Sequence, residues 1–231
     1  MTSTTSTARP RPLIIAIDGP SGAGKGTVAR AVAAKLGYRH VDTGAMYRAV
    51  AWKAVFERLD LEDGEQLAAL AARAVIDVSD GVVRVDGHDV KQAIRTPEID
   101  RAAAAVARQS GVREVLIRQQ REMGARGFVV MEGRDIGTVV FPGADLKIYL
   151  DASPEERARR RAGDTAHAAG KGGAAVQEIA SALAERDRSD STRAASPLSL
   201  AADAVPIDTT GIPIDEVVER VMALVRQRSE Q

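Results

Sequence analysis

The chain has 231 residues, of which 45% are hydrophobic and 28% charged, the proportions of an ordinary soluble globular protein. Its 32 basic residues balance 32 acidic ones, and no apolar run approaches the roughly 20 residues of a membrane span, so neither nucleic-acid binding nor a membrane role is expected. Cysteine is absent, which excludes disulfides, thiolate metal sites and cysteine nucleophiles.

The first residues, 1–11, are polar and lack the apolar core of a secretory signal. We expect them to form a disordered lead before the first strand. The remaining residues, 12–231, are of a length that suits one domain, and no internal repeat divides them. The sequence therefore predicts a cytoplasmic protein with a single domain, and we expect a monomer.

The first predicted strand is the apolar run 13–17, which has the composition of a parallel strand covered on both faces. Apolar residues at helical spacing follow from Gly26 to Leu36, and Gly37 ends that predicted helix. Between strand and helix lies a phosphate-binding P-loop pattern. Its members are Gly19, Pro20, Ser21, Gly22, Ala23, Gly24 and Lys25.

The P-loop pattern predicts an ATP site. Its glycines let successive backbone N–H groups point into one concavity, and the lysine supplies a charge for the β- and γ-phosphates. We expect the site to continue through Gly26 and Thr27. Thr27 is a candidate ligand of Mg²⁺, with Glu132 acting through water, but a threonine in a first helical turn can instead bond its own backbone.

A brief strand at 40–42 leads to a helix that Thr43 can cap. Thr43 and Arg48 lie close enough in sequence to hold one acceptor phosphate near that helix end, although a cap and a solvated arginine would give the same pattern. We expect an acceptor-binding region at about 43–127. Within it, β-forming residues alternate with turn residues and predict a β-rich insert at about 62–95.

Residues 98–123 have helical composition, and the apolar strand 128–131 follows them. Glu132, Gly133, Arg134 and Asp135 come directly after that strand, where the carboxyl edge of a parallel sheet presents ligand groups. A third core strand is predicted at 146–150. The last elements expected are a helix near 176–187, a strand at 204–208 and a helix at 217–225.

An arginine-rich helix at 155–161, opened by Pro154, leads into a small-residue stretch at 163–175 that we expect to be mobile. This composition predicts a lid at about 153–190 that closes arginines over the transferring phosphoryl group. Arg157 shares a helix face with Arg161 and also with Arg160; of these we expect Arg157 and Arg161 to point inward, with Arg159 solvated.

Three segments carry a resemblance that covers almost the whole chain. They are 42–48 (DTGAMYR), 132–142 (EGRDIGTVVFP) and 186–198 (RDRSDSTRAASPL). Together with the glycine that follows the P-loop lysine, they resemble bacterial cytidylate kinases, within the nucleoside monophosphate kinases. The resemblance implies a P-loop kinase of the α/β class, with three α/β/α layers, a central parallel sheet, a small β-containing acceptor insert and a mobile lid.

The same resemblance implies transfer of the γ-phosphoryl group of ATP, with Mg²⁺, to CMP or dCMP in pyrimidine nucleotide metabolism. It assigns the CMP phosphate to Thr43, Arg48 and Arg134, the cytosine to Arg113 and Asp135, the sugar to Arg186 and Asp190, and the neighbourhood of the phosphates to Arg193. Tyr47 joins this substrate-binding set. The expected catalytic group comprises Lys25, Arg134, Arg193, Arg157 and Arg161.

Cytosine chemistry agrees with the expected pair, because its N4 amino donor beside the N3 and O2 acceptors complements one carboxylate and one donor. Uracil would face an unpaired carboxylate. The sequence departs from the family at one position, where Ala104 stands in place of a serine that usually touches the base. Base selectivity is then left to Arg113 and Asp135.

Two other functions fit parts of the pattern. Another small-molecule P-loop kinase, of the adenylate or uridylate type, would be favoured if Arg113 and Asp135 lay away from the acceptor pocket. A nucleotide-binding regulatory module could keep the P-loop, but it would not need arginine-rich acceptor and lid segments. The histidines His40, His88 and His167 show no metal-ligand spacing, and we assign them no catalytic role.

Overall fold

The computed structural model describes residues 12–163 and 173–229. The lead at 1–11 and most of the stretch expected to be mobile, 163–175, lie outside the described residues. A five-stranded sheet forms the centre, in the order β2-β6-β1-β7-β8, and all neighbouring strands are parallel. Its strands are β1 (Ile14–Asp18), β2 (Arg39–Asp42), β6 (Val129–Glu132), β7 (Leu146–Asp151) and β8 (Val205–Asp208).

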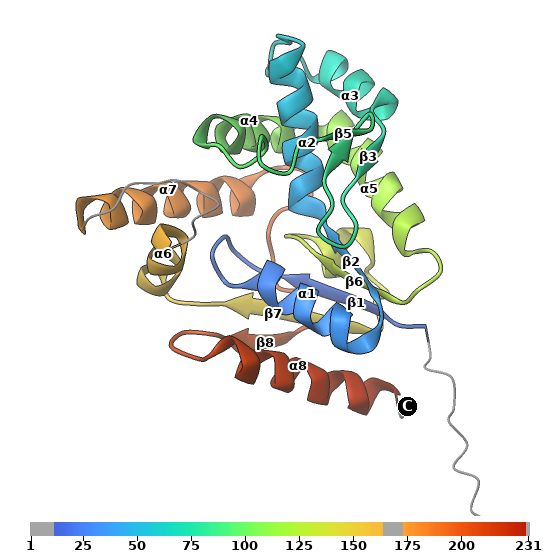
Figure 1. Cartoon of the computed structure of the whole chain (residues 1–231), viewed down its shortest axis with the longest axis vertical. Helices are drawn as coiled ribbons and strands as arrows, with labels where there is room; N and C mark the ends of the chain where they lie inside the picture. Colours follow the sequence, from blue (N-terminus) through green and yellow to red (C-terminus); the bar gives the residue numbers. More distant parts are fainter. Residues whose placement is uncertain (1–11, 164–172, 230–231) are drawn as a thin grey trace, which may run out of the picture.

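Both faces of this sheet are covered. Ile15 and Ile17 of β1 pack in one apolar cluster with α1 (Lys25–Leu36) and α8 (Ile214–Ser229), whereas Ala16 packs in a second cluster on the opposite face. Successive side chains of a strand point to opposite faces, so an apolar run can serve both clusters. The result is the predicted three-layer α/β/α arrangement, with helices on either side of a parallel sheet (Figure 1).

The chain between β2 and β6 forms a lobe at one end of the sheet (Figure 1). Its helices are α2 (Thr43–Phe56), α3 (Gly64–Arg73), α4 (Pro97–Arg108) and α5 (Ser110–Gly124). Its three antiparallel strands have two residues each: β3 (Ile76–Asp77), β4 (Arg84–Val85) and β5 (His88–Asp89). The range expected to be β-rich therefore also contains α3, whose buried Leu67, Leu70 and Ala71 recur at helical spacing.

The stretch of helical composition at 98–123 forms two helices in the structure. The expected span 98–123 breaks at Gln109, which has extended backbone angles, φ −76° and ψ 114°. On either side of the break, α4 packs against α2 while α5 packs against α3. The side-chain amide of Gln109 donates to the carbonyl of Leu61 at 3.2 Å, which fixes the corner. Two different packing partners, rather than a helix-breaking residue, separate the helices.

After β7, helices α6 (Pro154–Gly163) and α7 (Gly173–Thr192) pack against each other beside the lobe (Figure 1). A short π-helical turn, η1 (Ile136–Val140), follows β6 and has no counterpart among the sequence predictions. Within the described residues, no helix combines the length and the apolar character needed to cross a bilayer.

Candidate active site

A pocket of about 680 Å³ opens at the carboxyl ends of the central strands, between the sheet, the lobe and the helices α6 and α7. Ligand sites of open parallel sheets lie at this edge, because the loops that follow the strands converge there. Every residue predicted to bind the acceptor lines the pocket. These residues are Thr43, Tyr47, Arg48, Arg113, Arg134, Asp135, Arg186, Asp190 and Arg193.

The P-loop forms the donor side of the pocket. Gly24 has a left-handed backbone, φ 90°, at the start of α1, a conformation that glycine adopts without strain. At Gly19, φ is 142° and an added Cβ would lie 1.9 Å from the carbonyl oxygen of Leu150, so no side chain fits there. Ser21, Gly22, Gly24, Lys25, Gly26 and Thr27 line the pocket, whereas Gly19, Pro20 and Ala23 are not part of its lining.

Lys25 is the buried cation of the P-loop. Its Nζ donates to the carbonyl of Pro20 at 2.7 Å, and its side chain lies near Arg134 and Glu132. Burial, followed by repulsion from Arg134, lowers the pKa of Lys25 to about 7. A phosphate beside Nζ favours the charged form of the amine, so anion binding and protonation of Lys25 reinforce each other.

Asp18, at the end of β1, joins the donor loop to the segment that follows β6. Its carboxylate accepts from the backbone N–H groups of Ile136 at 2.9 Å and Gly137 at 2.7 Å. Burial raises the pKa of Asp18 to about 6, although these two hydrogen bonds oppose the shift. Asp18 therefore holds η1 against the start of the P-loop.

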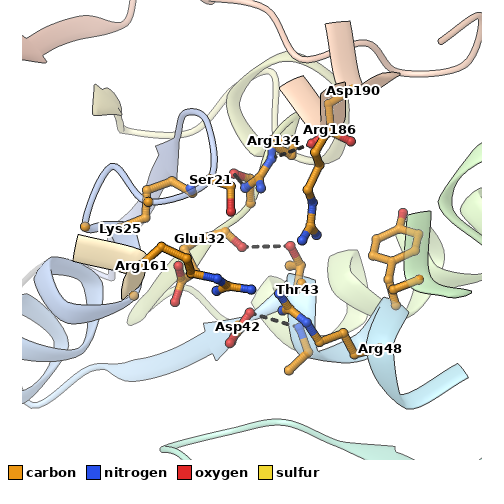
Figure 2. Close-up of a pocket in the computed structure, with 18 of the residues that line it drawn as sticks. Ser21, Lys25, Asp42, Thr43, Arg48, Glu132, Arg134, Arg161, Arg186 and Asp190 are labelled. Atoms are coloured by element: carbon orange, nitrogen blue, oxygen red, sulfur yellow. Dashed lines mark hydrogen bonds and ion pairs between the residues drawn. The ribbon is translucent and has the colours of Figure 1, made fainter. Parts of the chain in front are cut away.

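The acceptor side begins where α2 leaves β2. The predicted cap is displaced by one residue: Asp42 is the N-cap of α2 and accepts from the backbone N–H of Ala45 at 2.9 Å. The hydroxyl of Thr43 instead donates to the carbonyl of Glu132 at 2.7 Å, because its buried position faces the neighbouring strand β6 (Figure 2). Thr43 still lines the pocket at the helix start.

Three arginines from different helices point toward one another across the pocket (Figure 2): Arg48 of α2, Arg161 of α6 and Arg186 of α7. The carboxylate of Asp100 in α4 lies between them. Burial and repulsion from Arg48 and Arg134 lower the pKa of Arg186 to about 10. The sequence assigned Arg186 to the sugar, whereas its neighbours in the structure are the expected phosphate-binding arginines.

Arg113 and Asp135, the expected base-binding pair, form a buried ion pair with each other and both line the pocket. The guanidinium of Arg113 lies 5.3 Å from the ring centroid of Tyr47. Burial raises the pKa of Tyr47 to about 12, which keeps its hydroxyl neutral. Ala104 lines the same pocket from α4, and its place beside the base stays a prediction.

A second arginine–carboxylate group lies near the end of α7. Nε of Arg134 donates to Asp190 at 2.9 Å, and Nη1 of Arg193 donates to the other oxygen of Asp190 at 3.3 Å. Nη2 of Arg193 lies 3.8 Å from Asp135. The sequence placed Arg193 near the phosphates, but its position one helical turn after Asp190 brings it beside the Arg113–Asp135 pair.

The arginines of α6 that line the pocket are not the same set that the sequence predicted. Arg161 lines the pocket as expected, and Arg159 is 72% exposed, although it also borders the pocket. Arg157 is buried outside the pocket lining, which corrects its predicted inward role. Its guanidinium donates to the carbonyls of Ala152 and Ser21, both at 3.1 Å, and to Asp187. Arg157 thus supports the P-loop from behind.

Glu132 ends β6 on the floor of the pocket, next to the P-loop. Its Oε1 lies 3.0 Å from Nε2 of His40, which is buried on β2. A Cβ added at Gly26 would lie 3.1 Å from the same oxygen, so glycine at this position leaves room for the carboxylate. Thr27 and Glu132 both line this part of the pocket, and oxygen donors of this kind suit Mg²⁺.

Comparison with known proteins decides the family. A family model described as cytidylate kinase matches residues 15–227, which is nearly the whole chain. The chain belongs to the cytidylate kinase family. It is therefore a phosphotransferase, in agreement with the resemblance that the sequence motifs predicted.

Relatives with this name match over most of their length. A cytidylate kinase of Pelotomaculum thermopropionicum is 50% identical, over 91% of this chain and 95% of the relative. A cytidylate kinase of Solibacter usitatus is 47% identical, over 94% of this chain and 93% of the relative. A crystal structure of shikimate kinase from Bacteroides thetaiotaomicron has a TM-score of 0.51 at 14% identity, covering 93% of this chain and 98% of that one. The last likeness supports the P-loop kinase fold.

Sequence reasoning missed several polar residues of this cytidylate kinase family member. Asp18 had one usable signal, since it directly precedes the P-loop at a strand end. His40 lies in a predicted strand, and nothing local indicates that it meets Glu132. Arg160, which lines the pocket, donates to the hydroxyl of Thr209 at 2.9 Å. Asp100 lies on a helix without any motif, and its arginine partners are distant in sequence.

Proposed function

We propose that the chain is an ATP-dependent kinase of CMP and dCMP, which yields ADP with CDP or dCDP, and that the pocket is where the phosphoryl group is transferred. One observation carries the proposal: a single pocket joins the P-loop to the buried Arg113–Asp135 pair in a chain of the cytidylate kinase family. The donor and acceptor sites expected from the sequence thus share one cavity.

The chemistry needs little acid–base assistance, because the acceptor is a phosphate that is already anionic. In-line transfer then depends on holding two anions together and neutralising the charge of the transition state. Lys25 serves the donor phosphates. Arg48 and Arg134 serve the acceptor phosphate with the hydroxyl of Thr43, and Arg161 reaches across from the lid. Arg186 borders this group of cations, and we assign it to the phosphates rather than to the sugar alone.

Base recognition is assigned to Asp135, Arg113 and the wall formed by Tyr47 and Ala104. A carboxylate can accept from the N4 amino group of cytosine, and a guanidinium can donate to N3 and O2. Uracil presents O4 in place of the amino group, so it would set a carbonyl oxygen against the carboxylate. Arg193 and Asp190 complete the acceptor site beside this pair.

Mg²⁺ fits the donor side of the site. Thr27 would hold it directly and Glu132 through water, since both oxygen donors line the pocket beside the helix start. When bound with ATP, the ion neutralises charge on the phosphate oxygens. Its removal by a chelator should abolish turnover while leaving the fold intact. The cytoplasmic location and the monomeric state stay predictions from the sequence.

A coupled assay that follows ADP release from ATP and Mg²⁺ tests the proposal across CMP, dCMP, UMP and AMP. We expect kcat/KM for CMP or dCMP to exceed that for UMP and AMP. Equal or faster turnover of UMP or AMP would contradict the base assignment. ATP binding without transfer to any monophosphate would favour a regulatory module instead.

Asp135→Asn sharpens the same assay, because it keeps the size of the side chain, removes its charge and replaces one carboxylate oxygen with an N–H donor. We expect kcat/KM for CMP to fall by roughly 10- to 100-fold, corresponding to the 1–3 kcal/mol of a good bidentate base contact. UMP turnover should fall less. Glu114→Gln, which neutralises an exposed carboxylate next to Arg113 in sequence, is the matched control and should behave as the unmodified enzyme.

A further inference from the structure

Asp100, in the first turn of α4, is the meeting point of arginines from the lobe and the lid. Its Oδ1 accepts from Nε of Arg48 at 2.9 Å and lies 3.8 Å from Nη1 of Arg186. Its Oδ2 accepts from Nη2 of Arg161 at 2.6 Å. Arg48 belongs to α2, whereas Arg161 and Arg186 belong to α6 and α7. One carboxylate therefore connects the acceptor-binding lobe to both lid helices.

The contact to Arg48 orients that arginine instead of covering it. A guanidinium carries five N–H donors on three nitrogens, and Asp100 engages Nε. Nη1 of Arg48 lies beside the start of α2, 3.4 Å from the position that a Cβ on Gly44 would take. Arg134 repeats the arrangement, with its Nε on Asp190 at 2.9 Å. In both cases a carboxylate fixes one edge of an arginine that lines the pocket.

The charges around Asp100 explain why such a carboxylate is needed. Arg48, Arg134, Arg161 and Arg186 repel one another in a partly buried site. Asp100 pairs there with Arg48, Arg161 and Arg186, Asp190 pairs with Arg134, and Asp42 and Glu132 lie near enough to stabilise the charge of Arg48. Burial opposes ionisation of Asp100, but Arg48, Arg161 and Arg186 together hold its pKa below the usual range. Asp100 is thus charged at neutral pH, and it offsets part of the repulsion among these arginines.

We propose that Asp100 is a positioning residue for phosphoryl transfer, which holds the acceptor arginine Arg48 and the lid arginine Arg161 in one convergent arrangement. The inference rests on the proposed function for the identity of the reaction. Asp100 touches no reacting atom in this role. It acts by setting where two guanidinium groups stand when the phosphates arrive, and by joining the lid to the lobe.

The role has a kinetic signature that differs from that of a structural contact. Without the charge of Asp100, the arginines repel more strongly and lose their common orientation, so alignment in the transfer step suffers. The local potential becomes more positive at the same time, which favours ground-state binding of an anion. We therefore expect a lower kcat with a KM for CMP that is unchanged or lower.

The test compares Asp100→Asn with Glu98→Gln, which removes an exposed carboxylate from the same helical turn and is the matched control. Steady-state kinetics should show kcat of Asp100→Asn reduced by roughly 10- to 100-fold, the scale of a small misplacement of catalytic groups, with no rise in the KM for CMP. Asp100→Glu should restore part of kcat. Glu98→Gln should match the unmodified enzyme in kcat, KM and Tm.

Coupling to the lid is measured by combining Asp100→Asn with Arg161→Gln. If Asp100 acts through Arg161, the second substitution should change kcat by less than about twofold once the first is present. Independent, multiplicative losses would overturn the proposal. An unchanged kcat with a lower KM would also overturn it, because Asp100 would then only compete with phosphate. A raised KM at constant kcat would reduce Asp100 to a structural contact.

The experiment needs a second variant and a substrate-independent readout. Asp100→Ser, whose side chain suits a first helical turn, replaces Asp100→Asn if the latter does not fold, and the same outcomes apply. The effect is expressed as the ratio of variant to unmodified enzyme, measured with whichever monophosphate the unmodified enzyme uses best. A preference of the unmodified enzyme for UMP would then contradict the proposed function. The ratio of kcat between the Asp100 variant and the unmodified enzyme would still test the role of Asp100.

Discussion

The donor half of the pocket is lined by residues of one short loop within 21–27, whereas the acceptor half uses side chains from α2, α4, α5, α7 and the loop after β6. In the donor half, one buried cation, Lys25, faces the loop. In the acceptor half, arginines are paired with Asp100, Asp135 and Asp190. The backbone conformation of one loop is enough to form the donor half. The acceptor half brings several arginines close together, so it also needs carboxylates that offset their repulsion.

The largest loss of kcat is expected in the donor half, where a single cation rather than a group of arginines faces the phosphates. Lys25→Met should lower kcat by roughly 10³-fold, because the transition state loses its charge partner on the donor side. A single acceptor substitution, Arg48→Met, should cost roughly 10- to 100-fold, since neighbouring arginines compensate in part. Lys35→Met, at the exposed end of the same helix, is the control and should leave kcat unchanged. The measurement is steady-state kinetics with CMP. A larger loss of kcat in Arg48→Met than in Lys25→Met would contradict the contrast between the two halves.

The next effect concerns Asp18, where the two halves meet. Its pKa rises from 3.8 to about 6 on folding, so between these pH values the native state binds a proton that the unfolded state has released. Stability contributed at this site therefore falls as pH rises from about 4 to about 6 and stays constant above that. One pKa unit is about 1.4 kcal/mol, so the change approaches about 3 kcal/mol.

Denaturant unfolding of the unmodified protein and of Asp18→Asn, followed from pH 4 to pH 7, measures this contribution. The difference in unfolding free energy between the two should shift against the unmodified protein as pH rises to about 6. A difference that does not vary with pH would show that Asp18 titrates as an ordinary carboxyl. Asp145→Asn, at the opposite end of the sheet, where the carboxylate accepts from the N–H of Ile14, serves as the comparison.

The fold and the donor site follow from the sequence because their signals are local. The apolar run 13–17 and the nine residues after Asp18 are consecutive, so one strand–loop–helix unit contains the whole pattern. The acceptor residues were predicted by resemblance, and the structure brings them into one pocket. What sequence reasoning missed is pairing over long separations: Asp100 meets arginines 52 and 61 residues away, and His40 meets Glu132 across 92 residues.

Arg157 shows a second limit of sequence reasoning, because here a local pattern predicted a position that the structure does not show. Helical spacing places residues 157 and 161 on one face. In the structure, however, Arg161 lines the pocket, whereas Arg157 packs behind the P-loop and donates to the carbonyl of Ser21. Spacing identifies a shared face, but it does not say what that face packs against. Gly22 permits this close packing, since a Cβ there would lie 2.9 Å from Cβ of Arg157. The base of the lid helix is packed directly on the donor loop.

Arg157→Met should therefore act on stability more than on chemistry. It leaves the carbonyls of Ala152 and Ser21 and the carboxylate of Asp187 without their donor, and the unfolding free energy should fall by about 2 kcal/mol. Arg159→Met, on the exposed side of the helix, should leave it nearly unchanged. A loss of kcat as large as that of Arg161→Met, at unchanged Tm, would restore the catalytic role that the sequence indicated.

The smallest effect is expected at Ala104, where the resemblance to cytidylate kinases implies a serine. Ala104 lines the pocket from α4, so Ala104→Ser adds a hydrogen-bond donor and acceptor at the position proposed for the base. A net hydrogen bond contributes about 0.5–1.5 kcal/mol, which corresponds to a KM for CMP lower by roughly two- to tenfold. Ala104→Cys, close in size but weak in hydrogen bonding, should leave the KM near its original value. If serine and cysteine lower it equally, the gain comes from filled volume, and base recognition depends on Arg113 and Asp135 without help from this position.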